Sequence, residues 1–267
     1  MQGLKVIVTG ANRGIGRKVV EELAKDSTGI HKVIMTSRNP QQGLQVQQEI
    51  RETFSCGDLL DYHQLDMLDP KSIKAFAEFI AGNYSPVDVL LNNAGVYFRE
   101  QCEYDKAKDC IQTNLINLME LNQLLLPHFS EKGHIINVSS VLGSLQNIPG
   151  DQVKQALYSP ELTLEGIKQL ADDFLDSIKN RTFAQRGWPA CSYFASKALL
   201  NAYTRVISKD VGIRVNALHP GWVRTDMGGN SATKSIDEGA KTPLLLIRHQ
   251  GPETGTYWVD EARAEWI

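Results

Sequence analysis

The sequence predicts an α/β protein whose residues 1–267 form a single domain around a doubly wound parallel sheet. Two observations predict this fold. Short, apolar, β-branched segments alternate with amphipathic stretches of helical length, and a glycine-rich turn follows the first apolar segment. Strands that alternate with helices of ten or more residues are joined by right-handed crossovers and therefore run parallel. Such a sheet binds ligands beyond the carboxyl ends of its strands.

The first half of the chain alternates strand and helix without interruption. Leu4–Thr9 is short, apolar and β-branched, which is typical of a buried parallel strand. Gly14–Lys25 follows with apolar residues at helical spacing. The alternation continues with strands at Lys32–Met35, Tyr62–Leu65, Val87–Leu91 and His134–Val138, and with helices at Gln41–Thr53, Pro70–Ala81 and Asp105–Leu126.

Residues 149–189 break this alternation. Gln152–Tyr158 and Leu162–Lys179 both have helical spacing, and no strand separates them. We expect a helical insertion that packs on the surface of the domain. The regular pattern then resumes with a helix at Cys191–Ser208, a strand at Ile213–Leu218 and a last strand at Gly255–Val259.

Composition argues against several classes of function. The net charge is −3 and no long Lys/Arg run occurs, so nucleic-acid binding is not expected. No stretch of ~18 apolar residues could cross a membrane, and no signal peptide is recognised, so the cytoplasm is the expected location. The histidines are scattered and the cysteines form no CxxC pair, which argues against a metal site; the cysteines are Cys56, Cys102, Cys110 and Cys191.

The glycine-rich turn, Thr9–Gly16, reads TGANRGIG between the first strand and the first helix. Gly10 allows a tight reversal, Gly14 lets backbone N–H groups approach a pyrophosphate, and Gly16 permits close helix–strand packing. The start of the following helix adds unpaired N–H groups and a partial positive charge. This position in the chain predicts a Rossmann-type dinucleotide site.

The end of the second strand indicates which dinucleotide binds. An enzyme that uses NAD usually places an acid there, whereas this chain has Thr36-Ser37-Arg38. Arg13 lies inside the glycine turn, and two guanidinium groups can hold a 2′-phosphate by charge-assisted hydrogen bonds. We therefore expect NADPH as the cofactor; the alternative is that both arginines are solvated surface charges.

A tyrosine and a lysine stand four residues apart at Tyr193 and Lys197, in the run YFASK. On a helix these side chains share one face, so the ammonium can lie near the phenol. A nearby cation lowers the pKa of a tyrosine, and a phenol tuned in this way can exchange a proton with a carbonyl oxygen. The pair alone is a weak signal, because YxxxK also occurs by chance.

Other polar motifs lie at the carboxyl ends of the predicted strands or opposite them. Asn137–Ser140 ends the fifth strand, where a serine hydroxyl can stabilise a developing oxyanion. Asn92–Gly95 follows the fourth strand, and Thr113-Asn114 lies in the long helix. Pro220–Met227, which reads PGWVRTDM, follows the sixth strand. Each motif has an ordinary interpretation as a turn or loop, but together and in this order they predict one site.

These motifs in combination resemble the short-chain dehydrogenase/reductase family from Leu4 to about Val259. Among its members, the chain is most similar to the monomeric, NADPH-dependent carbonyl reductases. Three features carry that similarity: the Asn12-Arg13 turn, the PGWVRTDM stretch, and the insertion that separates Ser140 from Tyr193 by 53 residues. Leu218-His219 departs from the mammalian relatives, which have cysteines just before the Pro-Gly.

The resemblance implies a role for each matching residue. Asn114 would hold a water in a proton relay, Ser140 would polarise the carbonyl, and Tyr193 would be the acid and base. Lys197 would lower the pKa of the tyrosine and hold the nicotinamide ribose. The implied cofactor-binding residues are Gly10, Asn12, Arg13, Gly14, Ile15, Gly16, Arg38, Asp66, Asn93, Ala94, Gly95, Tyr193, Lys197, Pro220, Gly221, Val223 and Thr225.

The expected reaction is reduction of an aldehyde, ketone or quinone carbonyl, with Tyr193 as the proton donor. Five side chains are candidates for an apolar wall of the substrate pocket: Trp188, Trp222, Met227, Tyr97 and Phe98. In the carbonyl reductases the insertion covers the helical surface that other members use to dimerise. We therefore expect a monomer that acts on a small molecule.

Two alternatives remain open from the sequence. The same residues could oxidise a secondary alcohol or a steroid, because the chemistry is reversible. The chain could also be a non-catalytic NADPH-sensing protein, since a fold does not fix a function. Turnover of NADPH with a panel of carbonyl compounds distinguishes these possibilities.

Overall fold

A computed structural model describes residues 3–98 and 103–267. Within these residues, eight strands form one sheet in the order β3-β2-β1-β4-β5-β6-β7-β8. The strands β1 to β7 run parallel, and β8 is antiparallel to β7. The predicted doubly wound fold is confirmed. The strands are β1 (Leu4–Val8), β2 (Ile30–Ser37), β3 (Leu60–Gln64), β4 (Val87–Asn92), β5 (Phe129–Val138), β6 (Arg214–His219), β7 (Tyr257–Val259) and β8 (Ala262–Ala264).

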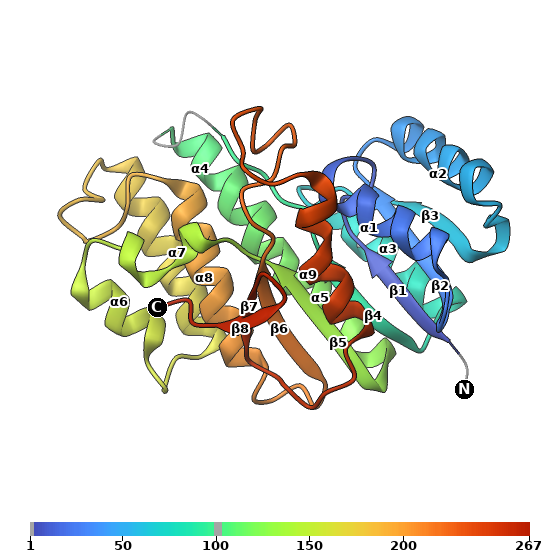
Figure 1. Cartoon of the computed structure of the whole chain (residues 1–267). Helices are drawn as coiled ribbons and strands as arrows, with labels where there is room; N and C mark the ends of the chain where they lie inside the picture. Colours follow the sequence, from blue (N-terminus) through green and yellow to red (C-terminus); the bar gives the residue numbers. More distant parts are fainter. Residues whose placement is uncertain (1–2, 99–102) are drawn as a thin grey trace.

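Helices cover both faces of the sheet, each over its own apolar core (Figure 1). One face is covered by α1 (Gly14–Lys25), α2 (Pro40–Phe54) and α9 (Ile236–Arg248). The other face is covered by α3 (Pro70–Asn83), α4 (Tyr104–Ile111), α5 (Asn117–Leu125) and α8 (Ser192–Ile207). Strand order reverses between β1 and β4, and sheets of this topology bind ligands beyond the carboxyl ends of the strands at such a point.

Capping side chains start the helices that follow β2 and β3. The Asn39 side chain accepts from the backbone N–H of Gln42, and Pro40 occupies the first turn of α2. The Asp69 side chain accepts from the N–H of Lys71 before Pro70 opens α3. A proline at the first turn costs no helical hydrogen bond, which explains why both helices begin at the residue that the sequence marks.

The insertion forms α6 (Asp151–Tyr158) and α7 (Leu164–Lys179), as predicted. Figure 1 shows both helices at the end of the molecule that lies away from β1 to β3. The apolar side of α7, which includes Phe174 and Ile178, is buried against α4 and α8. Arg205 of α8 donates to the carbonyl oxygens of Leu157 and Ser159 at 3.1 and 2.9 Å, which fastens the end of α6 to the domain.

The predicted long helix at 105–126 is not continuous. A π-helical turn, Gln112–Ile116, separates α4 from α5. Apolar spacing does not distinguish an i→i+5 turn from an α-helical one, so the sequence analysis missed it. Such turns occur often at functional sites, and this one contains Asn114.

Two elements near the C-terminus were not predicted. The helix α9 contains Pro243, which obscures its helical pattern, yet Ser235 and Glu238 form a reciprocal capping box at its start. The short strand β8 follows a tight turn at Asp260 and Glu261, whose φ values are +49° and +63°. Beyond β8, the Trp266 carbonyl accepts from the N–H of Leu145 at 3.1 Å, so the last residues return to the segment after β5.

Across residues 3–98 and 103–267, no helix has the length and apolar content that a bilayer crossing requires.

Candidate active site

The glycine-rich turn between β1 and α1 has backbone conformations that favour glycine. Gly10 and Gly14 have φ values of +64° and +57°. A Cβ on Gly10 would lie 2.9 Å from the Ala94 Cα, and a Cβ on Gly16 would lie 2.4 Å from the Asn93 Nδ2. The absence of side chains at these glycines therefore lets α1 and the end of β4 approach the end of β1 closely.

Hydrogen bonds join the segment after β4 to the end of β1. The Thr9 hydroxyl accepts from the N–H groups of Asn93 and Ala94 at 3.0 and 2.9 Å. The Asn93 side chain donates to the carbonyl oxygens of Thr9 and Gly10 at 2.8 and 3.1 Å. The structure thus brings the predicted 93–95 segment against the glycine turn, at the point where strand order reverses.

The start of α1 is suited to an anion. Its N-cap residue, Arg13, makes no side-chain capping hydrogen bond, and the first turn of this 12-residue helix contains no acid. The unpaired N–H groups and the positive end of the helix dipole favour a phosphate at this position. A turn that lacks Cβ atoms at Gly10, Gly14 and Gly16 and leads into such a helix start fits the pyrophosphate of a dinucleotide.

The two arginines predicted to read the 2′-phosphate are both exposed to solvent. Arg38 follows β2 and has an exposed side chain. Arg13 Nη1 lies 2.9 Å from Asp226 Oδ2, and their side chains are 71% and 75% exposed. The sequence did not suggest the pairing of Arg13 with Asp226. Of the other predicted cofactor residues, Asn12 donates to the Gln42 side chain at 3.3 Å, and Asp66 accepts from the N–H of Leu68 at 2.9 Å.

The loop after β6 reaches the glycine turn from the other half of the sheet. A Cβ on Gly14 would lie 3.4 Å from Thr225 Cγ2. The Thr225 hydroxyl donates to the Val223 carbonyl at 3.3 Å and accepts from the N–H of Gly228 at 3.2 Å, which holds its side chain in place. Gly221 has a φ of +95°, so the turn that starts this loop favours glycine. The predicted 220–225 segment therefore borders the predicted cofactor site.

Tyr193 and Lys197 lie in the first two turns of α8. The Lys197 ammonium lies 5.5 Å from the centre of the Tyr193 ring. Its Nζ donates to the Val138 carbonyl at 2.7 Å, so a direct bond to the sheet fixes its position. The side chain is 5% exposed. The predicted pair is therefore together, and it faces the carboxyl end of β5.

Ser140 lies directly beyond β5 and begins a short 3-10 helix, Val141–Gly143. Its hydroxyl accepts from the N–H of Leu142 at 3.1 Å, which orients the side chain. A Cβ on Gly143 would lie 2.5 Å from the Lys197 carbonyl carbon, so this turn packs directly on the backbone of α8. The contact sets the distance between the serine and the Tyr193–Lys197 pair.

The electrostatics of the pair differ from the sequence expectation. Burial raises the pKa of the Tyr193 phenol, and hydrogen bonding to Ser140 opposes that shift only in part. Burial also lowers the pKa of the Lys197 ammonium to about 8. The expected lowering of the tyrosine pKa by the lysine is not found, because desolvation of the phenol is the largest effect on its pKa.

Asn114 lies within the π-helical turn and is fully buried. Its Oδ1 accepts from the N–H of Val96 at 2.8 Å, and its Nδ2 donates to the Val96 carbonyl at 3.0 Å. These bonds tie the turn to the 93–96 segment. Both ends of the side-chain amide are therefore occupied by hydrogen bonds within the protein. Gly95 lies close to this amide, since a Cβ on Gly95 would lie 3.2 Å from Asn114 Oδ1.

Ser196 is a buried residue of this site that the sequence analysis did not single out. Its hydroxyl donates to the Tyr193 carbonyl at 2.8 Å and accepts from Asn114 Nδ2 at 3.1 Å. The Cys110 thiol lies 3.7 Å from the same hydroxyl. Ser196 thus connects the tyrosine turn to the asparagine turn, and its place directly before Lys197 was the available signal.

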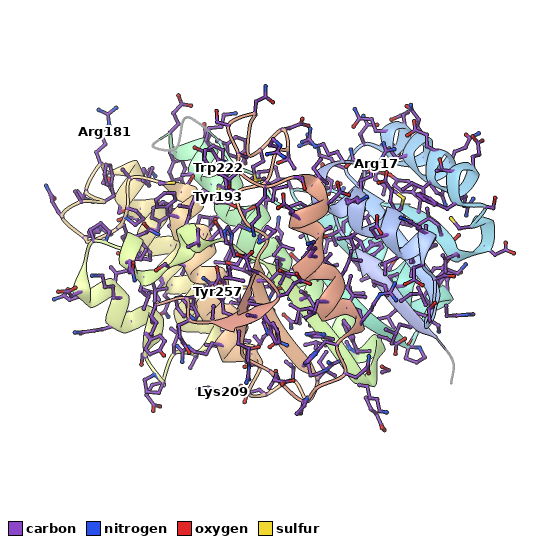
Figure 2. All side chains as sticks on the ribbon, viewed as in Figure 1. Arg17, Arg181, Tyr193, Lys209, Trp222 and Tyr257 are labelled. Carbon is purple, nitrogen blue, oxygen red and sulfur yellow. The ribbon has the colours of Figure 1, made fainter. Side chains whose placement is uncertain are left out.

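Three of the five predicted pocket residues have large exposed surfaces. Tyr97 packs edge-on against the Tyr193 ring with the ring centres 5.4 Å apart, and it is 39% exposed. Trp222 and Met227, from the loop after β6, are 52% and 46% exposed. Val141, directly after Ser140, is 51% exposed and was not predicted. Figure 2 shows Tyr193 and Trp222 toward the same edge of the molecule.

The other two predicted pocket residues lie elsewhere or are partly covered. Trp188 is 1% exposed, packs on Phe174, and donates its indole N–H to Asp173 at 2.6 Å. It belongs to the core of the insertion, which corrects the sequence interpretation. Phe98 is half-buried, with the Lys106 ammonium 5.1 Å from its ring centre.

His219 ends β6 next to Pro220 and is largely buried. Burial and the Lys234 ammonium lower the pKa of its imidazole to about 4, so the ring is neutral at physiological pH. Among the residues described, no three His, Cys, Asp or Glu side chains gather as ligands for a metal ion.

Comparison with known proteins identifies the family. The sequence profile of the short chain dehydrogenases matches residues 4–153. The chain is 34% identical to (+)-neomenthol dehydrogenase of Arabidopsis thaliana, covering 94% of both chains. It is 33% identical to carbonyl reductase (NADPH) 1 of Mus musculus, covering 90% of this chain and 89% of that protein. The structure of salutaridine reductase from Papaver somniferum is similar, with a TM-score of 0.86 and 27% identity over 96% of this chain and 99% of that chain. The chain therefore belongs to the short-chain dehydrogenase/reductase family of nicotinamide-dependent oxidoreductases.

Proposed function

We propose that the protein is an NADPH-dependent reductase of small aldehydes, ketones or quinones. The observation that carries the proposal is the convergence of Tyr193, Ser140 and Lys197 at one edge of the sheet, beyond the carboxyl end of β5. The glycine cradle lies at the same edge, where β1 and β4 end. A proton donor beside a nucleotide site is what carbonyl reduction requires.

The raised pKa of Tyr193 suits the reductive direction. A phenol that holds its proton throughout the neutral range can donate it to a carbonyl oxygen as negative charge develops there. The Ser140 hydroxyl, oriented by the Leu142 N–H, can donate a second hydrogen bond to the same oxygen. When bound, the nicotinamide supplies the hydride.

Lys197 and Asn114 assist Tyr193 without donating a proton to the substrate themselves. With its pKa near 8, the Lys197 ammonium remains charged at neutral pH and can hold the nicotinamide ribose. The backbone of Asn114 can position a water that returns a proton to Tyr193. The Asn114 side chain is not free for this role, since it is bonded to Val96 and Ser196. Both roles follow from the family resemblance, and the buried geometry supports them.

NADPH is proposed over NADH because the end of β2 offers a cation and no acid. Arg38 is exposed there, and Arg13 projects from the glycine turn. Two guanidinium groups favour a 2′-phosphate, whereas a carboxylate would repel it. The Arg13–Asp226 pair is largely exposed to water, so its disruption by a phosphate costs little.

An apolar substrate is proposed from the exposed side chains around Tyr193. Tyr97, Val141, Trp222 and Met227 come from three separate segments, and each leaves apolar surface in contact with water. A ring-bearing carbonyl compound could cover that surface and gain from its burial.

The monomeric state is proposed from the insertion. The helix α7 packs against α4 and α8 and buries Phe174, Leu175 and Ile178. It thereby covers the helical surface through which other family members are expected to associate. Light scattering should give a mass near 29.7 kDa; a stable dimer would contradict the assignment.

The central test is NADPH consumption with a panel of aldehydes, ketones and quinones. We expect turnover with at least one ring-bearing compound, and Tyr193→Phe should reduce kcat by about 10²–10⁴-fold while the Kd for NADPH changes little. Retained turnover in Tyr193→Phe would contradict the role of the phenol. NADPH binding with no turnover of any compound would favour a sensing protein.

A second candidate is oxidation of a secondary alcohol, which the similarity to (+)-neomenthol dehydrogenase favours. The same four residues, Asn114, Ser140, Tyr193 and Lys197, would serve that direction. Measurement of the forward and reverse rates with one alcohol–ketone pair at fixed pH separates the two.

A further inference from the structure

Helix α8 directs a line of polar side chains toward the sheet. Tyr193, Lys197, Asn201 and Thr204 are spaced so that they share one face of the helix. Two of them hydrogen-bond to residues of β5. The Lys197 ammonium donates to the Val138 carbonyl, and the Thr204 hydroxyl accepts from the Asn137 side chain at 2.9 Å. This line extends from the candidate active site into the interior.

Asn201 is the member of the line whose hydrogen bonding is incomplete. Its Nδ2 donates to the Gly143 carbonyl at 3.3 Å, on the same turn that holds Ser140. Its Oδ1 is buried and has no partner within the described protein, although the residue is only 2% exposed. A reversed amide would point Oδ1 at the Gly143 carbonyl oxygen, which cannot donate, so the orientation with Nδ2 toward Gly143 is favoured and leaves Oδ1 unsatisfied.

Tyr257 of β7 is a second buried residue with an unsatisfied polar group. The residue is 5% exposed, and its hydroxyl has no hydrogen-bond partner among the residues described. Burial raises the pKa of this phenol, so it carries its proton and can donate. Figure 2 shows Tyr257 below Tyr193, farther from the upper edge of the molecule on which Trp222 lies.

Asn201 and Tyr257 line one small cavity. Its volume is about 10 Å³, and its walls also include Thr204, Ala217 and Trp266. A cavity needs about 10–15 Å³, roughly one solvent-sized sphere, and two to four polar partners to hold a water. This cavity meets both conditions for one molecule and leaves no room for a larger ligand.

We propose that this cavity is a binding site for a single structural water that accepts from the Tyr257 hydroxyl and donates to Asn201 Oδ1. Buried polar groups are almost always hydrogen-bonded, and the water satisfies two of them at once. It also links α8, which carries Tyr193 and Lys197, to strand β7 at the C-terminal side of the sheet. Asn201 then contacts both the Ser140 turn and, through the water, β7.

A crystal structure of the unmodified protein at high resolution tests the proposal directly. We expect one ordered water within hydrogen-bond distance of Tyr257 Oη and the Asn201 side chain. An empty cavity, or a direct Tyr257–Asn201 hydrogen bond that closes it, would overturn the proposal. This readout requires no activity, so it is independent of the function proposed above.

The Tyr257→Phe variant gives a second test through the sign of its effect on stability. If a water bonds to the hydroxyl, the variant loses that bond and leaves Asn201 unsatisfied, and Tm should fall by about 2–4 °C. If the cavity is dry, removal of an unpaired buried hydroxyl should leave Tm unchanged or raise it. A Tm that does not fall contradicts the proposal.

Tyr203→Phe is the matched control. The Tyr203 hydroxyl is also buried on α8, but it accepts a direct hydrogen bond from Asn122 Nδ2 at 3.1 Å. Its removal should lower Tm whether or not the cavity near Tyr257 is hydrated. The control therefore calibrates the effect of losing one buried tyrosine hydroxyl in this protein.

Discussion

The two sides of the candidate site are built by different means. On the cofactor side, the glycine turn is shaped by backbone conformation, and each bond that joins residues 9–10 to residues 93–94 pairs a main-chain group with the Thr9 hydroxyl or the Asn93 side chain. On the substrate side, the geometry depends on side chains of α8 and of the segment after β5, held by specific bonds such as Lys197 to Val138 and Ser196 to Asn114. Cofactor binding should therefore respond to changes in backbone freedom and surface charge, whereas turnover should respond to the loss of single side-chain bonds.

A change of pH should produce the largest difference between the two sides, through its effect on kcat/KM. Burial lowers the pKa of Lys197 to about 8, so its ammonium is present below that pH and is lost above it, while the raised pKa of Tyr193 keeps the phenol protonated. We expect kcat/KM for reduction to be level below about pH 8 and then to fall roughly tenfold per pH unit.

Lys197→Met serves as the control for this profile. It should have low activity with no inflection near pH 8. A wild-type profile that stays level to pH 10 would show that the charge on Lys197 is not needed.

The next effect should be confined to the cofactor side. Arg38→Ala removes an exposed cation from the end of β2 and should raise the KM for NADPH by about 10–100-fold, because a charge-assisted hydrogen bond contributes about 1.5–3 kcal/mol. The KM for NADH, which lacks the 2′-phosphate, should not change. Equal effects on both cofactors would mean that Arg38 does not read the phosphate.

A backbone change on the cofactor side should affect binding alone. Gly14 has a φ of +57°, and a Cβ there would lie 3.4 Å from Thr225 Cγ2, which is ordinary contact. Gly14→Ala therefore introduces conformational strain of about 1–2 kcal/mol without a severe clash, and the Kd for NADPH should rise about 5–30-fold. Saturating NADPH should restore kcat; a lower kcat at saturation would mean that the turn also orients the reacting atoms.

The smallest effect should arise on the substrate side. Ser196→Ala removes the bonds to Asn114 Nδ2 and the Tyr193 carbonyl, and we expect kcat to fall about fivefold, equivalent to about 1 kcal/mol, with the Kd for NADPH unchanged. If Ser196 had only a structural role, Tm would fall and kcat would not.

Ser177→Ala is the matched control for Ser196→Ala. Ser177 is likewise fully buried on a helix and donates to a carbonyl in the preceding turn, that of Phe174 at 2.6 Å. It lies on α7, away from the candidate site, so its removal should affect Tm without changing kcat.

Much of the fold was predictable because its signals are local. Asn39-Pro40 and Asp69-Pro70 mark helix starts by capping and by the fixed φ of proline, and the apolar β-branched runs mark the central strands. The capping box at Ser235 and Glu238 would also have revealed α9, had Pro243 not obscured the helical pattern.

The rest depended on tertiary contacts that local patterns do not contain. The π-helical turn at Gln112–Ile116 is held by bonds from Asn114 to Val96 and Ser196, which are distant in the sequence. Trp188 resembled a pocket residue because aromatic side chains line both pockets and cores, and only burial distinguishes them. The i, i+4 spacing placed Lys197 near Tyr193 correctly, but it could not indicate that desolvation outweighs the charge.

The hairpin formed by β7 and β8 has a consequence for how the chain tolerates insertions and deletions. Its two strands are in antiparallel register, with Tyr257 opposite Ala264 and Val259 opposite Ala262. Because alternate residues of a strand face opposite sides, one residue added or removed at the Asp260–Glu261 turn would reverse the orientation of everything that follows. The Trp266 carbonyl that accepts from Leu145 would then point away from the segment that follows Ser140. A length change more than 100 residues away in the sequence would thus be transmitted to the edge that carries the candidate active site, through the C-terminal tail.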